Sequence, residues 1–222
     1  MNHSSEVFLD RSSDPSVRGS LHRPAQPNGD GLILTHGAGS NSHSPLLIAL
    51  ADVFSQSGFL VLRCDLPYRQ VRPYGPPRPG ESSRDRAGLL GAVGVMRKMA
   101  SRGIFLGGHS YGGRQCSILA AENPDLVEGL LLSSYPLHPP GKPQQLRTQH
   151  LPNLRTPALF VHGTRDPFGS IEEMEQALKL IPVATRLLSV EAAGHDLGFK
   201  GKQRPQDLPE RIRSEFLSFF HK

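Results

Sequence analysis

The pentapeptide Gly108-His109-Ser110-Tyr111-Gly112 constrains this chain more than any other feature, because it matches the pattern G-x-S-x-G. A short apolar run at 103–107 precedes it, and residues 113–122 follow with a helical pattern. A serine on a sharp turn from strand to helix exposes its hydroxyl group, and the following backbone N–H points to the same place. The bare pattern is also common as a simple glycine-rich turn. Its position between a strand and a helix favours the nucleophile turn.

Short apolar runs alternate with helical patterns along the rest of the chain. Strands are expected at 6–10, 17–21, 31–36, 59–64, 103–107, 126–133, 158–162 and 185–190, and helices at 45–57, 83–101, 113–122, 170–180 and 207–220. Pro45 suits a first helical turn, and Ser83 is expected to be an N-cap. Continuous apolar strands alternating with helices predict an α/β fold, with a mostly parallel central sheet and helices on both faces. The first two strands are expected to form a hairpin, and the Pro-rich loops 65–82 and 134–157 to border the site without regular structure.

Length and composition predict a single domain over 1–222, with enough residues for a substantial core. The N-terminus has no signal-peptide pattern, and no apolar run approaches the ~18 residues of a membrane span, so a cytoplasmic protein without membrane contact is expected. The two cysteines, Cys64 and Cys116, are interpreted as small buried hydrophobes. No pair of histidines has metal-ligand spacing, and neither a metal nor a cofactor is expected.

The formal net charge of +5 is concentrated in one segment. Residues 63–102 hold nine Arg and Lys side chains and three acidic ones. Such an excess can attract nucleic acid or anionic substrates. A solvated helix face with structural ion pairs is the preferred interpretation, because no aromatic interleaving or reader motif accompanies the charge. The oligomeric state is left open.

A serine hydroxyl group needs a histidine base, which a carboxylate must orient. Asp166 and His195 each follow a predicted strand downstream of Ser110, so they are expected at the same edge of the sheet. Asp196 is a second candidate for the carboxylate. Its place next to His195 makes a facing hydrogen bond awkward, and Asp166 is preferred.

Four motifs together resemble the α/β-hydrolase superfamily. They are Gly-His-Ser-Tyr-Gly at 108–112, His-Gly-Ala-Gly at 36–39, His-Gly-Thr-Arg-Asp at 162–166 and Gly-His-Asp at 194–196. The chain is similar to the small, lidless dienelactone-hydrolase-like proteins, and within them to a branch related to testis-expressed and chromatin-complex hydrolase-like proteins. The resemblance implies Ser110 as nucleophile, His195 as general base and then acid, and Asp166 as its orienting residue. Dienelactone hydrolases proper carry cysteine where this chain carries Ser110.

An oxyanion hole needs two fixed donors. One is the backbone N–H of Tyr111, directly after the serine, and the resemblance implies Ala38 for the other. The side chains expected to contact substrate are Tyr68, Arg69, Tyr135, Leu137 and His43. Arg69 could bind an anionic group of the substrate, or could instead pair with Asp65 or Glu81.

Three further histidines, His36, His109 and His162, are expected to be structural, with His109 packed under the turn. Residues 134–157 are too few and too rich in Pro and Gln for a cap domain. The sequence therefore predicts a serine hydrolase, carboxylesterase-like, that cleaves a small carboxylic ester through an acyl-enzyme on Ser110. The alternatives are an acyltransferase or thioesterase with the same triad, amide cleavage, or a non-catalytic interaction module on this fold.

Overall fold

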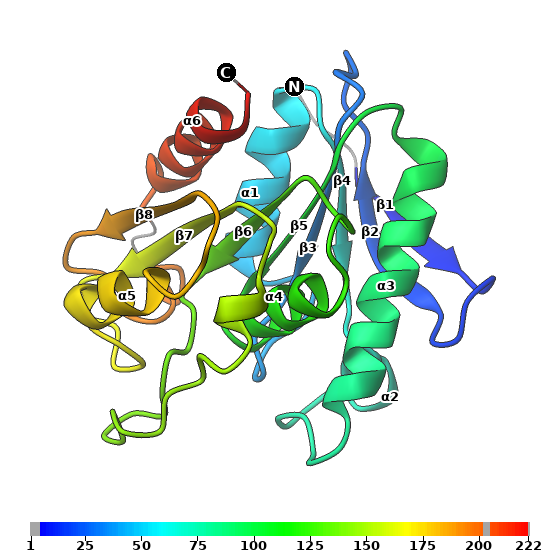
Figure 1. Ribbon diagram of the computed structural model, residues 1–222. Coiled ribbons are helices and arrows are strands. Elements are labelled where there is room, and N and C mark those ends of the chain that lie inside the picture. Colours follow the sequence, from blue (N-terminus) through cyan, green and yellow to red (C-terminus); the bar gives the residue numbers. More distant parts are fainter. Residues whose placement is uncertain (1–4, 202–204, 222) are drawn as a thin grey trace.

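The computed structural model describes residues 5–201 and 205–221, which form an eight-stranded sheet in the order β1-β2-β4-β3-β5-β6-β7-β8 (Figure 1). The strands are β1 (Ser5–Asp10), β2 (Val17–His22), β3 (Gly31–Thr35), β4 (Leu60–Cys64), β5 (Ile104–His109), β6 (Gly129–Ser133), β7 (Ala158–Gly163) and β8 (Thr185–Val190). The expected hairpin is present: β2 pairs antiparallel with β1 and with β4, and the strands from β4 to β8 pair in parallel. The predicted α/β fold with a mostly parallel sheet is confirmed.

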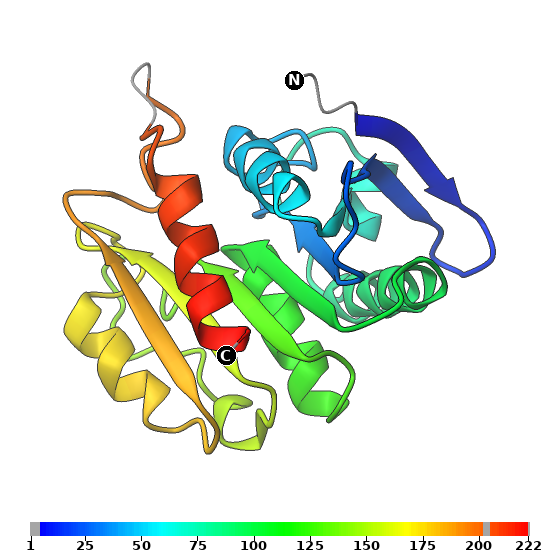
Figure 2. The same ribbon diagram turned by 90° about the horizontal axis from the view of Figure 1, so that it is seen from above.

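Helices cover both faces of the sheet. They are α1 (Pro45–Gln56), α2 (Pro67–Val71), α3 (Ser82–Met99), α4 (Tyr111–Glu122), α5 (Ile171–Leu178) and α6 (Leu208–Phe220), with the 3-10 helix η1 at Leu151–Asn153. Seen from above, α1 and α6 lie on one face of the sheet, while α3, α4 and α5 lie on the other (Figure 2). Among these described helices, none is both long enough and apolar enough to cross a membrane.

The core on the α6 face is rich in aromatic rings. Helix α6 buries three side chains spaced four residues apart against the sheet, those of Leu208, Ile212 and Phe216. The ring of Phe216 meets Phe54 and Phe105 at centroid distances of 5.0 and 4.9 Å, in edge-to-face arrangements that aromatic quadrupoles favour. A single apolar stripe thereby fastens the end of the chain to the sheet.

Several element boundaries differ from the sequence predictions. The long helix α3 begins at Ser82, with Glu81 at the N-cap and no capping side chain, so the prediction of Ser83 as N-cap was wrong. The 65–82 loop is not wholly irregular, because Pro67 opens the short helix α2, where a fixed φ and a missing N–H do no harm. Strand β6 begins three residues later than expected, at Gly129. Residues 134–157 hold η1 as their regular element, and no cap domain is built there.

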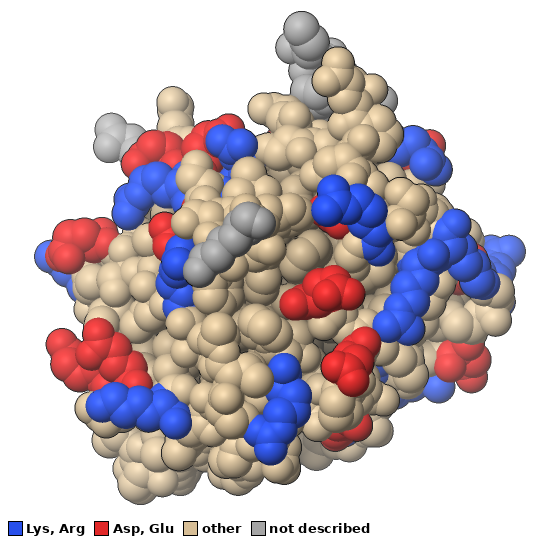
Figure 3. Space-filling view, turned by 45° about the horizontal axis from the view of Figure 1, so that its top comes forward, with Lys and Arg blue, Asp and Glu red and all other residues tan. Residues whose placement is uncertain are grey.

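Ion pairs absorb much of the basic excess at 63–102. Arg72 pairs with Glu81, Arg84 with Asp14 and Arg86 with Glu122, while Arg63 and Arg69 are buried. Acidic and basic side chains are interspersed over the face shown in Figure 3. Structural ion pairs and burial therefore account for five of the nine basic side chains of this segment.

Candidate active site

Ser110 lies between β5 and α4 and has a backbone conformation that residues other than glycine rarely adopt. Its φ is 53° and its ψ is −118°. Such a conformation costs about 1–3 kcal/mol and persists only where the surroundings enforce it. Here the N–H of Ser110 donates to the carbonyl of Ser133 at 2.8 Å, and its own carbonyl accepts from the N–H of Arg114 at 2.9 Å. The turn thereby holds the serine side chain at the carboxyl edge of the sheet.

The glycines of the motif are required by close backbone approach. A Cβ atom on Gly112 would lie 2.5 Å from the carbonyl oxygen of His36, and one on Gly108 would lie 2.7 Å from the backbone nitrogen of Gly113. Both contacts are too short for real Cβ atoms. The G-x-S-x-G spacing is thus what lets α4 start against the end of β3.

The structure brings Ser110, His195 and Asp166 together from three separate strand ends. The Nε2 atom of His195 lies 2.7 Å from the Oγ atom of Ser110. The Nδ1 atom of the same ring lies 2.8 and 3.0 Å from the two carboxylate oxygens of Asp166. A carboxylate only accepts, so this network assigns the proton of the neutral ring to Nδ1 and leaves Nε2 free to accept from the serine hydroxyl. This is the tautomer that a general base requires.

Asp196, the rival carboxylate, faces another way. Its side-chain oxygens accept the backbone N–H groups of Gly198 and Lys200 at 3.1 and 2.9 Å. Asp166 is buried, and one of its oxygens also accepts the N–H of Phe168 at 2.9 Å. The geometry therefore places Asp166, rather than Asp196, behind His195.

Two side chains hold His195 in position. His109 donates from Nε2 to the carbonyl oxygen of His195 at 2.8 Å, and burial lowers the pKa of His109 to about 4, which keeps it neutral. The ring of Phe168 stacks on the imidazole of His195, with 4.1 Å between centroids and 28° between planes. Sequence reasoning treated His109 only as packing and missed Phe168. The signal for Phe168 was its place two residues after Asp166.

A pocket of about 300 Å³ opens beside Ser110. Its apolar wall is made by Pro45, Leu46, Phe168 and Phe199, and its polar side chains include Ser40, Ser44, Asp196 and Lys200. The sequence analysis named none of these as contacts. All of them lie in segments that follow strand ends or start helices at this edge, which is where ligands bind in open α/β sheets. The volume is at the low end for small-molecule sites and fits a small acyl group.

The segment Gly37-Ala38-Gly39-Ser40, which we call the oxyanion loop, lines this pocket together with Ser110. In the described part of the chain, no acceptor is bonded to the N–H of Ala38. The N–H of Tyr111 belongs to the first turn of α4, where helix geometry leaves donors free. The two donors expected from the sequence are therefore available at the same edge as the serine.

Tyr68 and Arg69 do not line this pocket, contrary to the prediction that they contact substrate. Both are buried, with 3% and 5% of their surface exposed. The guanidinium of Arg69 donates to four backbone carbonyls, those of Ala38, Ser40, Arg72 and Gly75. It is consequently not free to bind an anionic substrate. Nor does it pair with the two expected carboxylates.

The three remaining predicted contacts also lie away from the pocket. Tyr135 is buried and donates its hydroxyl to the carbonyl of Arg147 at 2.7 Å. Leu137 is buried against Gly169. His43 is exposed and lines a different hollow beside β2, with Asn41 and Asp65. All three residues follow strand ends as expected, but the loops direct their side chains away from the pocket beside Ser110.

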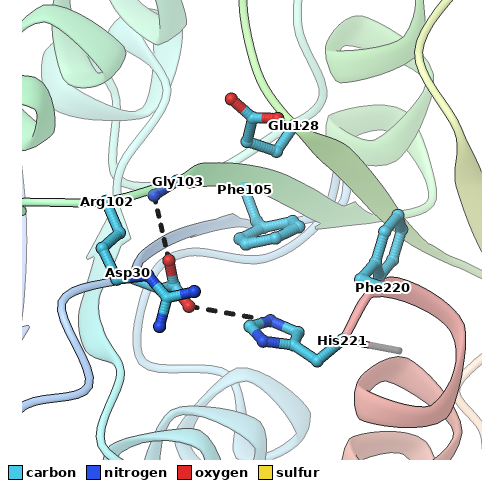
Figure 4. A pocket seen from close by; sticks show the side chains of 7 residues that line it. All are labelled: Asp30, Arg102, Gly103, Phe105, Glu128, Phe220 and His221. Atoms are coloured by element: carbon cyan, nitrogen blue, oxygen red, sulfur yellow. Dashed lines mark hydrogen bonds and ion pairs between the residues drawn. The ribbon is translucent and has the colours of Figure 1, made fainter.

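A larger hollow, of about 440 Å³, lies at the opposite, amino edge of the parallel strands (Figure 4). There Asp30 accepts the N–H of Gly103 at 2.9 Å and pairs with His221 at 3.6 Å. Phe105 and Phe220 form its apolar side. It has no serine or cysteine nucleophile beside a base, so its volume does not make it the reactive site. Among the described residues, no cluster of three or more His, Cys, Asp or Glu could hold a metal ion.

Known proteins resemble this chain in sequence and in fold. A family model described as an alpha/beta hydrolase domain matches residues 28–215. A 2-hydroxy-6-oxononadienedioate/2-hydroxy-6-oxononatrienedioate hydrolase from Pseudomonas sp. is 29% identical over 136 residues, which are 58% of this chain and 44% of that protein. The chain thus spans less than half the length of this curated relative.

Solved structures share the fold over nearly the full length. Dienelactone hydrolase from Anabaena variabilis superimposes with a TM-score of 0.77 at 21% identity, covering 98% of this chain and 99% of that one. A serine hydrolase without a lid from Xanthomonas campestris superimposes with a TM-score of 0.74 at 13% identity, covering 100% and 98%. These likenesses concern the fold, including the missing lid.

Proposed function

The chain belongs to the alpha/beta hydrolase family, and from this premise we propose that it is a serine hydrolase that cleaves a small carboxylic ester through an acyl-enzyme on Ser110. The observation that carries the proposal is the chain of contacts from Ser110 Oγ through the His195 ring to Asp166, at 2.7 and 2.8 Å. A non-catalytic interaction module gains nothing from a serine held in a strained turn against a correctly oriented base.

In the proposed reaction, Nε2 of His195 takes the proton of the Ser110 hydroxyl while Oγ attacks the ester carbonyl. The carbonyl oxygen becomes an oxyanion, which accepts hydrogen bonds from the N–H groups of Ala38 and Tyr111. As the tetrahedral intermediate collapses, His195 gives its proton to the leaving alcohol and the acyl group stays on Oγ. A water molecule, deprotonated by His195, then attacks the acyl-enzyme, and the serine leaves with that proton as the carboxylic acid is released.

The walls of the pocket favour a small and uncharged acyl group. The surface that lines it is mainly apolar, and its two charged side chains, Asp196 and Lys200, have opposite signs. Arg69, which the sequence analysis considered for an anionic substrate, is committed to backbone carbonyls. We therefore propose that neutral short-chain esters react faster than esters carrying a carboxylate. Thioesters, amides and acyl acceptors other than water would use the same residues.

The test of the function is covalent labelling with a fluorophosphonate probe, followed by peptide mapping. The wild-type protein is expected to be labelled on Ser110, and Ser110→Ala is expected to lose all labelling. Initial rates with acetyl, butyryl and succinyl esters then measure the size and charge preference. An unlabelled wild-type protein, or equal labelling of Ser110→Ala, would exclude the proposed nucleophile.

A further inference from the structure

Three of the four carbonyl groups in the oxyanion loop, those of Gly37, Ala38 and Ser40, accept hydrogen bonds from buried side chains. The carbonyl of Gly37 accepts from Nδ1 of His36 at 2.9 Å and from the N–H of Ser40 at 3.1 Å. The carbonyl of Ala38 accepts from the hydroxyl of Tyr68 at 2.9 Å and from Arg69 at 3.1 Å. The carbonyl of Ser40 accepts from Nε of Arg69 at 2.7 Å. The side chains of His36, Tyr68 and Arg69 thus hold this short loop through its carbonyl oxygens.

The direction of these bonds determines where the loop N–H groups point. In a planar trans peptide, the carbonyl of one residue and the N–H of the next point in opposite directions. Holding the Gly37 carbonyl toward the interior therefore turns the Ala38 N–H away from it. Holding the Ala38 carbonyl toward the interior likewise turns the Gly39 N–H away from the interior. The loop also lines the pocket of Ser110, so N–H groups that turn away from the buried donors are available on the pocket side.

The same network reaches the other half of the oxyanion hole through Asp85. This buried carboxylate accepts the N–H of Tyr68 at 3.1 Å on Oδ1 and the hydroxyl of Tyr111 at 2.7 Å on Oδ2. The rings of Tyr68 and Tyr111 also meet edge to face, with 6.0 Å between centroids. One carboxylate consequently ties the residue after the nucleophile to the residue that holds the loop.

We propose that Tyr68, Arg69 and Asp85 form a positioning clamp that aims both oxyanion donors, the N–H groups of Ala38 and Tyr111, at the reacting carbonyl. The clamp rests on the proposed function of Ser110. None of its three side chains touches substrate. Its members act by fixing the backbone groups that do, and donors fixed in advance are what make an oxyanion hole effective.

The guanidinium geometry explains why an arginine occupies position 69. Its five donors lie in one rigid fork, and a single guanidinium therefore reaches carbonyls on both the oxyanion loop and the 72–75 turn. Its carbon Cζ also lies 5.0 Å from the ring centroid of Tyr68, which fixes the two side chains against each other. A lysine would offer one nitrogen and could not make these contacts together.

The test compares Tyr68→Phe and Arg69→Met with Arg97→Met. Arg97 also donates to a backbone carbonyl, that of Leu126 at 2.6 Å, but at the amino edge of the sheet. On a short-chain ester, the two clamp variants are expected to lose about 10-fold or more in kcat with KM within twofold, a smaller effect than the ~10²–10³-fold loss of an oxyanion donor itself. Arg97→Met is expected to keep the wild-type kcat.

Affinity for an alkyl boronic acid reports on the direction of the oxyanion donors and not only on overall activity. The tetrahedral adduct of the boronic acid with Ser110 places an oxygen where the oxyanion forms. The boronate Kd is expected to rise by the factor by which kcat falls. Arg69→Lys is expected to recover little of the kcat that Arg69→Met loses. Wild-type kcat and boronate Kd in a folded Tyr68→Phe protein would overturn the clamp. Tyr68→Phe removes one hydroxyl and is the deciding variant if Arg69→Met fails to fold.

An independent readout distinguishes failure of the clamp from failure of the proposed function. NMR order parameters of the Ala38 and Gly39 amides are expected to fall in Tyr68→Phe whether or not the protein turns over an ester. Unchanged order parameters contradict the clamp. An unlabelled Ser110 in the wild-type protein contradicts the function instead.

Discussion

The Nε2 atom of His195 lies 2.7 Å from the Oγ atom of Ser110, although 85 residues separate them along the chain. The contact exists because β5, β7 and β8 all end at the same edge of a parallel sheet. Strand β7, which is followed by Asp166, lies next to β8 and two strands from β5. Parallel strands gather their carboxyl ends, and reactive groups carried there meet without being neighbours in sequence.

Replacing Asp166 with Asn is expected to lower kcat by about 10³–10⁴-fold while the fold is retained. An amide NH₂ facing Nδ1 of His195 favours the tautomer with the proton on Nε2, and that ring cannot accept the serine proton. Asp196→Asn is the matched comparison, because Asp196 bonds only to backbone N–H groups among the described residues. We expect it to change kcat by less than about 10-fold. Equal losses in the two variants would contradict the assignment.

Gly112→Ala is expected to lower the free energy of unfolding by about 1–3 kcal/mol, because its Cβ atom would lie 2.5 Å from the carbonyl oxygen of His36. Gly94→Ala in α3 is the control, since its added Cβ atom meets nothing within 4 Å. That change is expected to raise stability by about 0.5–1 kcal/mol, as alanine does in a helix interior. Urea unfolding of the two variants measures both signs. If both variants shift the midpoint in the same direction, the short distance between Gly112 and the carbonyl of His36 does not explain why glycine occupies position 112.

Stability is expected to fall as the pH falls from about 6.5 toward 4. Burial lowers the pKa of His36 and His109 to about 4 in the folded protein, and burial together with the charges of Arg114 and Arg86 lowers the pKa of His150 to about 4. An unfolded histidine titrates near 6.5, so in this window the unfolded state binds protons that the folded state does not. Each group contributes a loss of up to about 1.4 kcal/mol per pH unit.

The measurement for this pH dependence is the urea midpoint at pH 7, 6 and 5. His150→Gln removes one titrating group and is expected to flatten the slope by about one proton. If the urea midpoint of His150→Gln depends on pH as steeply as that of the wild-type protein, His150 does not contribute to the pH dependence.

Both cysteines are expected to be inert in the folded protein. Cys64 and Cys116 are buried, and burial raises the pKa of the Cys64 thiol to about 12 and that of Cys116 well above its usual value. Thiolate is the reactive form of cysteine. These two side chains carry little thiolate, and a reagent cannot reach them in the folded protein. A thiol reagent at pH 8 is expected to modify neither cysteine in buffer and both in denaturant. Rapid modification of the native protein would contradict the described packing.

Local patterns were sufficient for the strands, the five longer helices and the pentapeptide turn, but not for α2 and η1. Apolar runs with flanking glycines identify strands, and a four-residue apolar repeat identifies α6, because both patterns reflect which face of an element is buried. Boundaries were less predictable. Ser83 is a good N-cap residue in isolation, yet α3 starts earlier, where Asp85 is drawn into the interior by Tyr68 and Tyr111.

By itself, the sequence determined the fold class and the candidate triad of Ser110, Asp166 and His195, since each of the three follows an apolar strand and the carboxyl ends of parallel strands meet at one edge. Only the tertiary structure decided what Tyr68 and Arg69 do. Their position after β4 predicted an approach to the substrate, but the side chains turn under the oxyanion loop instead. Side-chain direction in a loop depends on which buried carbonyls need donors, and those carbonyls come from a segment about 30 residues away. No local pattern records that requirement.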